Sequence, residues 1–257
     1  MYGLKECSRG KQMPRHEAKR TPAPNEYTEE YFLTNCGGFK EYLKGEIPLR
    51  HTKALEYLHV NRGEAILDIG CGRGELLRTC DKKGAIAIGI DYSPAAVNIS
   101  GRGNDVKVAV IQASATALPF RDRIFDKVIM LDIVEHLAPD DLLKCLKDVR
   151  RVLKDSGHIL IHTPNQWGDY VSSLYCRMSS RLRPHPKVKT ALGRCNYDSL
   201  HVNVLNPISL QSVLRRAGFR SRIWFAGHPL QDREYQWVVV DKILFFLTTM
   251  WCRAYKV

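Results

Sequence analysis

The sequence of 257 residues lacks three patterns that would point to a secreted, redox-active or membrane-spanning protein. Its eight cysteines are scattered and form no C-x-x-C pair, which argues against a zinc ribbon or a thioredoxin-type site, and we expect no metal site. The N-terminus is basic but has no apolar run, so it does not resemble a secretory signal. No stretch reaches about 18 uninterrupted apolar residues, the length of a spanning helix. We therefore expect a reduced, cytoplasmic protein, either soluble or attached at the periphery of a membrane.

Acidic residues are also in short supply. Lysine and arginine total 39 against 27 aspartates and glutamates, so the net charge is +12. This imbalance favours an anionic partner, which could be nucleic acid, an anionic membrane surface or a phosphorylated substrate. The net charge alone does not distinguish among these three kinds of partner.

The chain divides by composition into three parts. Residues 1–25 hold six basic residues, two acidic residues and three prolines, which predicts a mobile basic arm. Aromatic and aliphatic residues at helical spacing predict a helical lid over residues 26–60. Residues 61–257 then form one domain, because 44% of the chain is hydrophobic and no internal repeat divides it.

Apolar runs and amphipathic segments alternate from Ala65 onward. The helices are predicted around 74–82, from the Ser93 cap, over 142–153 with a stop at Gly157, and from Asn206 to a stop at Gly218. Buried runs separated by single helices predict an α/β fold with a parallel sheet covered on both faces. The predicted strands are 65–70, 85–90, 106–113, 125–133, 158–163, 219–225 and, after a connecting helix, a final edge strand near 250–256.

A glycine turn, Asp68-Ile69-Gly70-Cys71-Gly72-Arg73-Gly74, links the first predicted strand to the first helix. Glycines let a ligand approach the backbone closely, and a helix N-terminus offers free N–H donors. Dinucleotide-binding folds use a related turn, but here the spacing is G-x-G-x-G and an aspartate comes two residues before the first glycine. A carboxylate there suits a ligand with a positively charged amino group, such as S-adenosylmethionine.

A second carboxylate, Asp91, ends the second predicted strand, 21 residues after Gly70. This is the expected position for an acid that accepts hydrogen bonds from a ribose diol. Tyr92 beside it could cover one face of an adenine. Together these residues predict an adenosine pocket at the carboxyl ends of parallel strands.

Four segments carry a resemblance to a known family: ILDIGCGRGELL, GIDYSPAAV, ALPFRDRIFDKVIMLDIVEHL and RVLKDSGHILIHTPN. In this order and spacing the chain resembles a class I S-adenosylmethionine-dependent methyltransferase of the type 11 group, which includes the ubiquinone and menaquinone biosynthesis enzymes. The resemblance covers residues 48–164 and, more loosely, 201–219. It implies a Rossmann-like, seven-stranded, mostly parallel sheet with helices on both faces and an antiparallel last strand.

The resemblance also implies a cofactor site. Arg50 matches an arginine that reaches the cofactor in ubiquinone-type relatives, although it could equally be a solvated helix residue. Many relatives have an aspartate before ALPF that contacts adenine, whereas this chain has Ser114 there, followed by Ala115. The implied cofactor-binding residues are Arg50, Asp68, Gly70, Gly72, Gly74, Asp91, Tyr92, Ser114, Ala115, Leu131 and Asp132.

Methyl transfer requires a base only if the acceptor loses a proton. His136, just past the fourth predicted strand, is the candidate catalytic base, because histidine titrates near neutral pH; alternatively it orders the loop. Asp132 is expected to position the backbone near the methyl donor. Asn165 and His201 are the candidate acceptor-binding residues, with a loop role equally open for His201.

Each of two further segments is open to two interpretations. The basic and aromatic segment at about 168–200 occupies the place where this fold inserts substrate-recognition elements, and the alternative is a solvated basic loop. The apolar run 243–247 suits either an interfacial membrane helix or a buried crossover helix, and the second interpretation is favoured.

The expected function is transfer of a methyl group from S-adenosylmethionine to a small or lipid-linked acceptor, an anionic one being compatible with the charge, most simply at oxygen. The main alternative is a nucleic-acid-modifying or nucleic-acid-binding protein, suggested by the charge. A cofactor-binding regulator without turnover and a nicotinamide-dependent oxidoreductase are further alternatives. Asp68 argues against the last of these.

Overall fold

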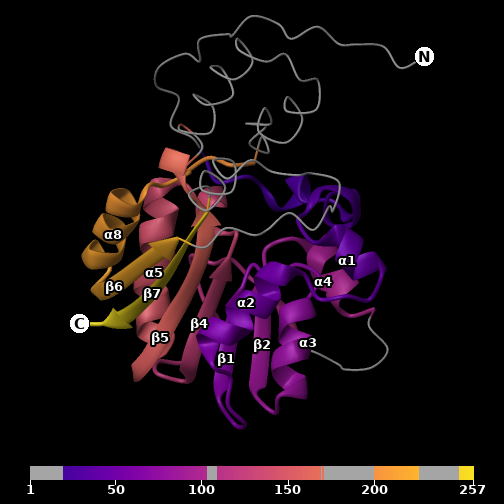
Figure 1. Ribbon diagram of the computed structural model, residues 1–257, viewed down its shortest axis with the longest axis horizontal. Coiled ribbons are helices and arrows are strands. Elements are labelled where there is room, and N and C mark those ends of the chain that lie inside the picture. The colour runs from indigo at the N-terminus through magenta and orange to yellow at the C-terminus, as the bar shows by residue number, and fades with distance from the viewer. Residues whose placement is uncertain (1–19, 103–108, 169, 171–199, 226–248) are drawn as a thin grey trace, which may run out of the picture.

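The computed structural model describes residues 20–102, 109–168, 170, 200–225 and 249–257. Its centre is a seven-stranded sheet with the strand order β3-β2-β1-β4-β5-β7-β6 (Figure 1). Strands β1 to β5 are parallel, and β7 is antiparallel to both β5 and β6. The strands are β1 Ala65–Ile69, β2 Ile86–Asp91, β3 Ala109–Gln112, β4 Phe125–Leu131, β5 Leu153–Pro164, β6 Phe219–Phe225 and β7 Thr249–Lys256.

Helices cover both faces of this sheet, which confirms the predicted fold class. The α-helices are α1 Phe39–Leu43, α2 Leu49–Leu58, α3 Glu75–Lys82, α4 Pro94–Ser100, α5 Pro139–Val152 and α8 Pro207–Arg216. Three shorter helical turns are η1 Pro24–Glu26, η2 Tyr31–Asn35 and η3 Val134–His136. Among the described residues, we find no helix that has both the length and the apolar character to cross a bilayer.

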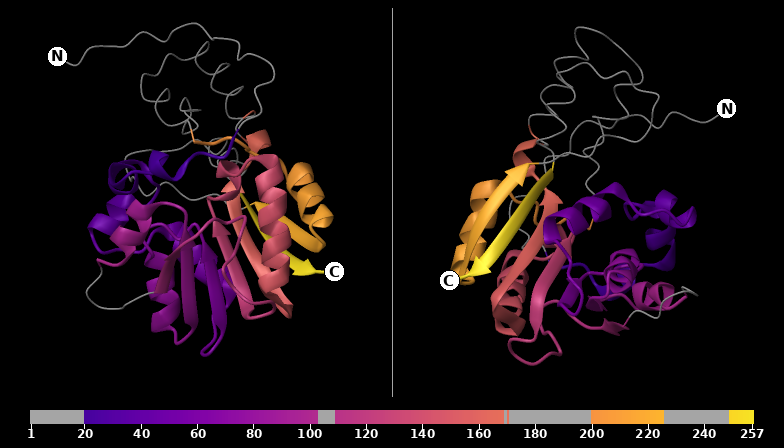
Figure 2. Two further views of the ribbon diagram at one scale, coloured as in Figure 1. Left: turned by 180° about the vertical axis from the view of Figure 1, so that it is seen from behind. Right: turned by 60° about the horizontal axis from the view of Figure 1, so that its bottom comes forward.

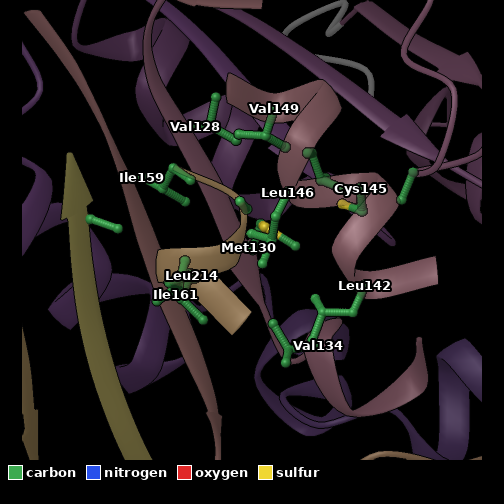
Figure 3. Close-up of a cluster of buried hydrophobic side chains, with 14 of the residues drawn as sticks. Val128, Met130, Val134, Leu142, Cys145, Leu146, Val149, Ile159, Ile161 and Leu214 are labelled. Carbon is green, nitrogen blue, oxygen red and sulfur yellow. The ribbon is translucent and has the colours of Figure 1, made fainter. Parts of the chain in front are cut away.

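The alternation of side chains along each strand builds two cores. Val128 of β4 lies in one core with Leu146 of α5 and Leu214 of α8 (Figure 3). Leu67 of β1 belongs to the same core. The view from behind shows α5 and α8 over this face of the sheet (Figure 2). Ile66, the neighbour of Leu67, faces the opposite side, toward α2 and α3. Strands buried on both faces therefore appear in the sequence as continuous apolar runs.

Local signals place the helix starts correctly. The Ser93 hydroxyl accepts hydrogen bonds from the backbone N–H groups of Ala95 and Ala96 at the start of α4. Asn206 caps α8 in the same way through Ser209. The expected stop at Gly218 also agrees with the structure, where α8 ends at Arg216 and Gly218 has φ +83°.

Three expectations about the strands need correction. Gly157 does not end a helix: α5 stops at Val152, and Gly157 lies inside β5, where an added Cβ would come within 2.7 Å of the Asp126 carbonyl oxygen. Strand β4 ends at Leu131, because Asp132 has φ +53° and leaves the strand. Strand β7 is not an edge strand, since it lies between β5 and β6. The first residues of the third predicted strand, 106–108, and the connecting helix before β7 lie outside the described residues.

The N-terminal segment is helical over part of the expected lid and packs beside α4. Phe32 of η2 is buried with Ala96 and Ile99 of α4. Residues 1–19 of the expected arm lie outside the described residues, but Thr21 already contacts the body: its hydroxyl donates to Asp141 at 2.6 Å and accepts from the Ala138 N–H. This end of the expected arm is therefore packed against α5.

Candidate functional site

A cavity of about 760 Å³ opens at the carboxyl ends of β1, β2 and β4, beneath the N-terminal segment. This is the point where the strand order reverses from β1 to β4, the usual ligand site of open α/β sheets. The sheet contributes Asp68, Asp91 and Leu131 to the lining, and the N-terminal segment contributes Tyr27 and Phe32. One cavity therefore joins the predicted cofactor residues to the aromatic residues of the expected lid.

The glycine turn forms the floor of the cavity. Gly70 has φ +72°, and an added Cβ would lie 2.9 Å from Cδ1 of Ile133, so both backbone strain and close packing require glycine there. Gly72 has φ +52° and donates its N–H to the Asp91 carboxylate at 2.9 Å. Gly74 is the N-cap of α3 and does not line the cavity. The turn thus brings the backbone at Gly70 and Gly72 directly to a ligand.

The two predicted carboxylates are held differently. Each oxygen of Asp91 accepts a backbone N–H, one from Gly72 and one from Ser93 at 2.9 Å, which leaves further lone pairs for a ligand. Asp68 is buried, and among the described residues no hydrogen-bond donor contacts its carboxylate. Burial, together with repulsion from Asp91 and Glu75, raises the pKa of Asp68 to about 7. A buried carboxylate without a donor is the expected partner of a ligand cation.

Asp132 is the centre of an ionic cluster at the end of β4. Arg50 donates to one carboxylate oxygen at 2.8 Å, and Nδ1 of His162 lies 2.5 Å from the other. Burial acts to raise the pKa of Asp132, but His162 and Arg50 outweigh it and hold that pKa well below its ordinary value. The Asp132 backbone is left-handed, so the cluster holds a strained residue in place. Arg50 is mostly buried and also donates to the Gly37 carbonyl at 2.6 Å, so it is not a solvated helix residue.

Arg73 lines the cavity, and the sequence reasoning missed it although it stands inside the glycine turn. Its side chain is 2% exposed and donates to the carbonyl oxygens of Phe32 and Gly37, at 2.6 and 2.9 Å. It also pairs with Glu75 at 2.8 Å. Arg73 therefore fastens the N-terminal segment over the turn. The signal that the sequence offered for Arg73 was its position between Gly72 and Gly74 of the glycine turn.

A second group of titratable residues also lines the cavity. His136 lies in η3, and its Nδ1 is 3.1 Å from the Tyr27 hydroxyl. His201 reaches His136 because the backbone N–H groups of 202 and 203 donate to the Glu135 carbonyl; the two imidazole rings are 4.7 Å apart. Glu135, His136 and His201 each offer one atom that could bind a metal ion, and these atoms lie within 4.8 Å of one another. The expected absence of a metal stays a prediction.

The remaining predicted site residues divide into two groups. Tyr92, Ser114 and Ala115 line the cavity beside Asp91, as an adenine contact would require, and the Ser114 hydroxyl lies 2.9 Å from that of Thr116. Asn165 does not line the cavity: its side chain is buried and accepts the Trp167 N–H at 3.2 Å. The predicted acceptor elements in 171–199 lie outside the described residues.

These residues fit S-adenosylmethionine better than a dinucleotide. Asp68 lacks a donor and suits the ammonium group of the methionine part, whereas it would repel a pyrophosphate. Asp91 and Tyr92 stand where ribose hydroxyls and adenine would bind. The roles of the individual residues remain predictions until ligand binding is measured.

Comparison with known proteins identifies the family of the chain. Residues 67–161 match the model of a family described as a methyltransferase domain. A demethylmenaquinone methyltransferase of Tropheryma whipplei is 32% identical over 180 residues, covering 66% of this chain and 72% of that protein. A ubiquinone biosynthesis O-methyltransferase of Alkalilimnicola ehrlichii is 32% identical over 123 residues, covering 46% of this chain and 49% of that protein. The chain thus spans about half the length of several curated relatives that it matches.

A solved structure supports the fold independently. The crystal structure of an S-adenosylmethionine-dependent methyltransferase from Archaeoglobus fulgidus superposes with a TM-score of 0.57 at 24% identity, covering 85% of this chain and 98% of that one. With an identity below 25%, this match shows the fold alone. Combined with the relative from Tropheryma whipplei and the fit of the cavity, it leads to one assignment: the chain belongs to the class I methyltransferases, whose cofactor is S-adenosylmethionine.

Proposed function

We propose that this protein transfers a methyl group from S-adenosylmethionine to a hydroxyl oxygen of a small or lipid-linked acceptor. The observation that carries the proposal is the continuity of the cavity. The lining that includes Asp68 and Asp91 also includes Tyr27, His136 and His201. A volume of about 760 Å³ is in the usual range for sites that hold a cofactor or ligand of this size.

The residues of the chain have separate tasks in this reaction. Asp68 binds the ammonium group, Asp91 the ribose hydroxyls, and Tyr92 covers the adenine. The cofactor supplies a methyl group already activated on a sulfonium, so the protein's main task is to align the acceptor oxygen with it. Asp132 does not serve as the base, because Arg50 and His162 stabilise its charged form.

The charge of the cavity supports an acceptor that is neutral at its reacting end. The three arginines of the described lining are already engaged: Arg50 pairs with Asp132, Arg73 with Glu75, and Arg20 with Glu26. An anionic group on the acceptor would need cations from elsewhere, and the basic segment predicted for that task lies outside the described residues. The expected contact with a membrane surface would involve the same basic segment, so that contact also stays a prediction.

The names of two relatives support the acceptor class. One is a demethylmenaquinone methyltransferase and the other a ubiquinone biosynthesis O-methyltransferase. Both names refer to quinone-related compounds, and the second refers to oxygen. We extend to this chain only the general class, a hydroxylated acceptor that can be linked to a lipid.

Incubation with methyl-labelled cofactor and a cell extract, followed by separation into lipid, small-molecule, nucleic-acid and protein fractions, tests the proposal. We expect label in the lipid or small-molecule fraction, and less label with Asp91→Ala protein at a limiting cofactor concentration. Label in the nucleic-acid or protein fraction alone would contradict it.

A nucleic-acid substrate is the second candidate, because the net charge is +12. Filter binding with RNA at increasing salt separates the two candidates. Binding through phosphate contacts alone loses affinity steeply between about 50 and 200 mM salt. Tight RNA binding that survives 200 mM salt, with label transferred to the RNA, would favour the second candidate.

A further inference from the structure

The first turn of α2 places a polar side chain at the cavity that neither the cofactor prediction nor the proposed function uses. His51 lines the cavity, is 7% exposed, and its Nδ1 is buried without a hydrogen-bond partner among the described residues. We infer that His51 and the N-terminus of α2 form an anion subsite, which binds the carboxylate of the methionine part of S-adenosylmethionine. The inference rests on the cofactor and not on the acceptor, so it goes beyond the proposed function.

The course of α2 along the sheet brings its first turn to the carboxyl ends of the strands (Figure 1). Directly after the helix, the His59 carbonyl accepts a 2.9 Å hydrogen bond from Lys127 near the start of β4. At the beginning of the helix, Arg50 donates to Asp132, the residue that follows β4. Helix α2 therefore runs antiparallel to β4 and, because β1 and β4 are parallel, antiparallel to β1 as well.

The directions of the side chains place His51 on the same side of the sheet as Asp68. Ala54 of α2 and Ile66 of β1 belong to one core. His51 precedes Ala54 by three residues and shares its face of the helix. Asp68 follows Ile66 by two residues and shares its face of the strand. Since α2 and β1 run in opposite directions, His51 and Asp68 both lie beyond this core, toward the cavity that they line together.

The structure of the cofactor explains why a second partner is needed near Asp68. S-adenosylmethionine carries its ammonium and its carboxylate on the same carbon atom. A site that holds the ammonium at Asp68 must therefore also satisfy a carboxylate close by. The three arginines of the described lining already pair with carboxylates of the chain. His51 has no such pair among the described residues, and its imidazole can donate an N–H.

The surroundings of His51 favour an anion. Burial lowers the pKa of His51 well below its ordinary value, and Arg50, Arg73 and His162 act in the same direction, whereas Asp132 acts against them. The ring is therefore neutral at pH 7, and the guanidinium groups near it attract a negative charge. Among the described residues no side chain caps α2, so its N-terminus adds the partial positive charge of the helix dipole.

A thermodynamic cycle of two ligands and two proteins tests the subsite without any acceptor. Decarboxylated S-adenosylmethionine lacks the carboxylate but keeps the ammonium, the sulfonium and the adenosine. In calorimetry of the full-length protein at pH 8, the wild type should bind S-adenosylmethionine about tenfold more tightly than the decarboxylated compound. His51→Leu should weaken binding of S-adenosylmethionine by about tenfold and of the decarboxylated compound by less than about twofold. His51→Gln, which keeps an N–H donor, should lose less than His51→Leu.

Two controls separate a lost contact from a damaged fold. Thr52→Ala changes the next, exposed residue of α2 and should bind both ligands as the wild type does. The compound 5′-methylthioadenosine lacks the whole amino-acid part, so the wild type and His51→Leu should bind it equally.

The inference and the proposed function fail in different ways. Equal losses for both S-adenosyl compounds in His51→Leu, or no loss for either, would overturn the inference. An effect of His51→Leu confined to the KM of an acceptor would also overturn it, because the anion would then belong to the acceptor. The absence of labelled lipid or small molecules would overturn the proposed function alone, since the cycle contains no acceptor.

Discussion

Two carboxylates at the end of neighbouring strands have opposite environments at the residue scale. Asp91 receives backbone N–H groups from Gly72 and Ser93, whereas Asp68 is buried without a donor among the described residues. The first environment suits a partner with neutral hydroxyl groups. The second suits a cationic partner, and both roles are predictions that the following experiments test.

Removal of the Asp91 side chain tests the first role. Asp91→Ala should weaken S-adenosylmethionine binding by about tenfold or more, because charge-assisted hydrogen bonds to the ribose are lost. Isothermal titration calorimetry measures the affinity. Asp81→Ala, which removes an exposed carboxylate of α3, is the control and should bind as the wild type does. Equal affinities for both variants would refute the ribose contact.

The pH dependence of binding tests the role of Asp68. Its pKa is raised to about 7 in the free protein, and a ligand cation binds the ionised form. Affinity for S-adenosylmethionine should therefore fall by up to about tenfold per pH unit below pH 7 and level off above about pH 8. Binding near pH 7 should also release a proton, which calorimetry in buffers of different ionisation enthalpy detects.

Asp68→Asn is the matched variant for this experiment. It should bind more weakly at pH 8 and lose most of the pH dependence, because the amide does not titrate. A wild-type affinity that is constant between pH 5.5 and 8.5 would rule out the proposed ammonium contact.

The glycine turn and the N-terminal segment are coupled at the scale of elements. Arg73 of the turn lines the cavity and donates to two carbonyl oxygens of the N-terminal segment, those of Phe32 and Gly37. Arg50 of α2 adds a third hydrogen bond, to Gly37. The N-terminal segment over the cavity is therefore held by two arginines, Arg73 of the glycine turn and Arg50 of α2.

Replacement of Arg73 tests this coupling. Arg73→Met should lower the free energy of unfolding by about 3 kcal/mol, because it breaks a buried ion pair and leaves Glu75 uncompensated. Urea unfolding measures the change. Hydrogen exchange should at the same time increase over residues 31–43. Arg62→Met, at an exposed arginine, should change stability by less than about 0.5 kcal/mol. A Tm and an exchange pattern equal to those of the wild type would show that Arg73 does not fasten the segment.

At the scale of the whole molecule, strand β7 packs against elements that come much earlier in the chain. Trp251 is fully buried and packs against Tyr57 of α2, with ring centroids 5.0 Å apart, and against His162 of β5 at 4.5 Å. Strand β7 therefore supports both helix α2 and the ionic cluster of Asp132.

Loss of the Trp251 side chain should affect the whole fold. We expect Trp251→Ala to lower the free energy of unfolding by about 3–5 kcal/mol, the usual cost of a cavity left by a large aromatic residue. Tyr255→Ala, on the same strand but partly exposed, should cost about 1 kcal/mol. Denaturant unfolding of both variants measures the difference, and equal losses would contradict the central place of Trp251.

The sequence allowed the cofactor end of the site to be predicted more completely than the acceptor end. Asp68, Gly70, Gly72 and Asp91 lie within 24 residues, and short loops after neighbouring strands must bring them together. Tyr27 and His136 meet across 109 residues, and no local pattern indicates that contact. The place of Asn165 at the end of a strand predicts an acceptor contact, but its side chain accepts the Trp167 N–H and does not line the cavity.

What the sequence determined by itself is the set of local choices: apolar runs that become strands, the caps Ser93 and Asn206, and a glycine turn that only a backbone with positive φ can form. The tertiary structure alone decided that Gly157 continues a strand, that β7 enters between β5 and β6, and that Arg73 holds the N-terminal segment over the cavity. The physical reason is the distance along the chain over which each interaction acts. Dihedral preferences and capping act over a few residues, whereas these three outcomes depend on the packing of segments that are far apart in the chain.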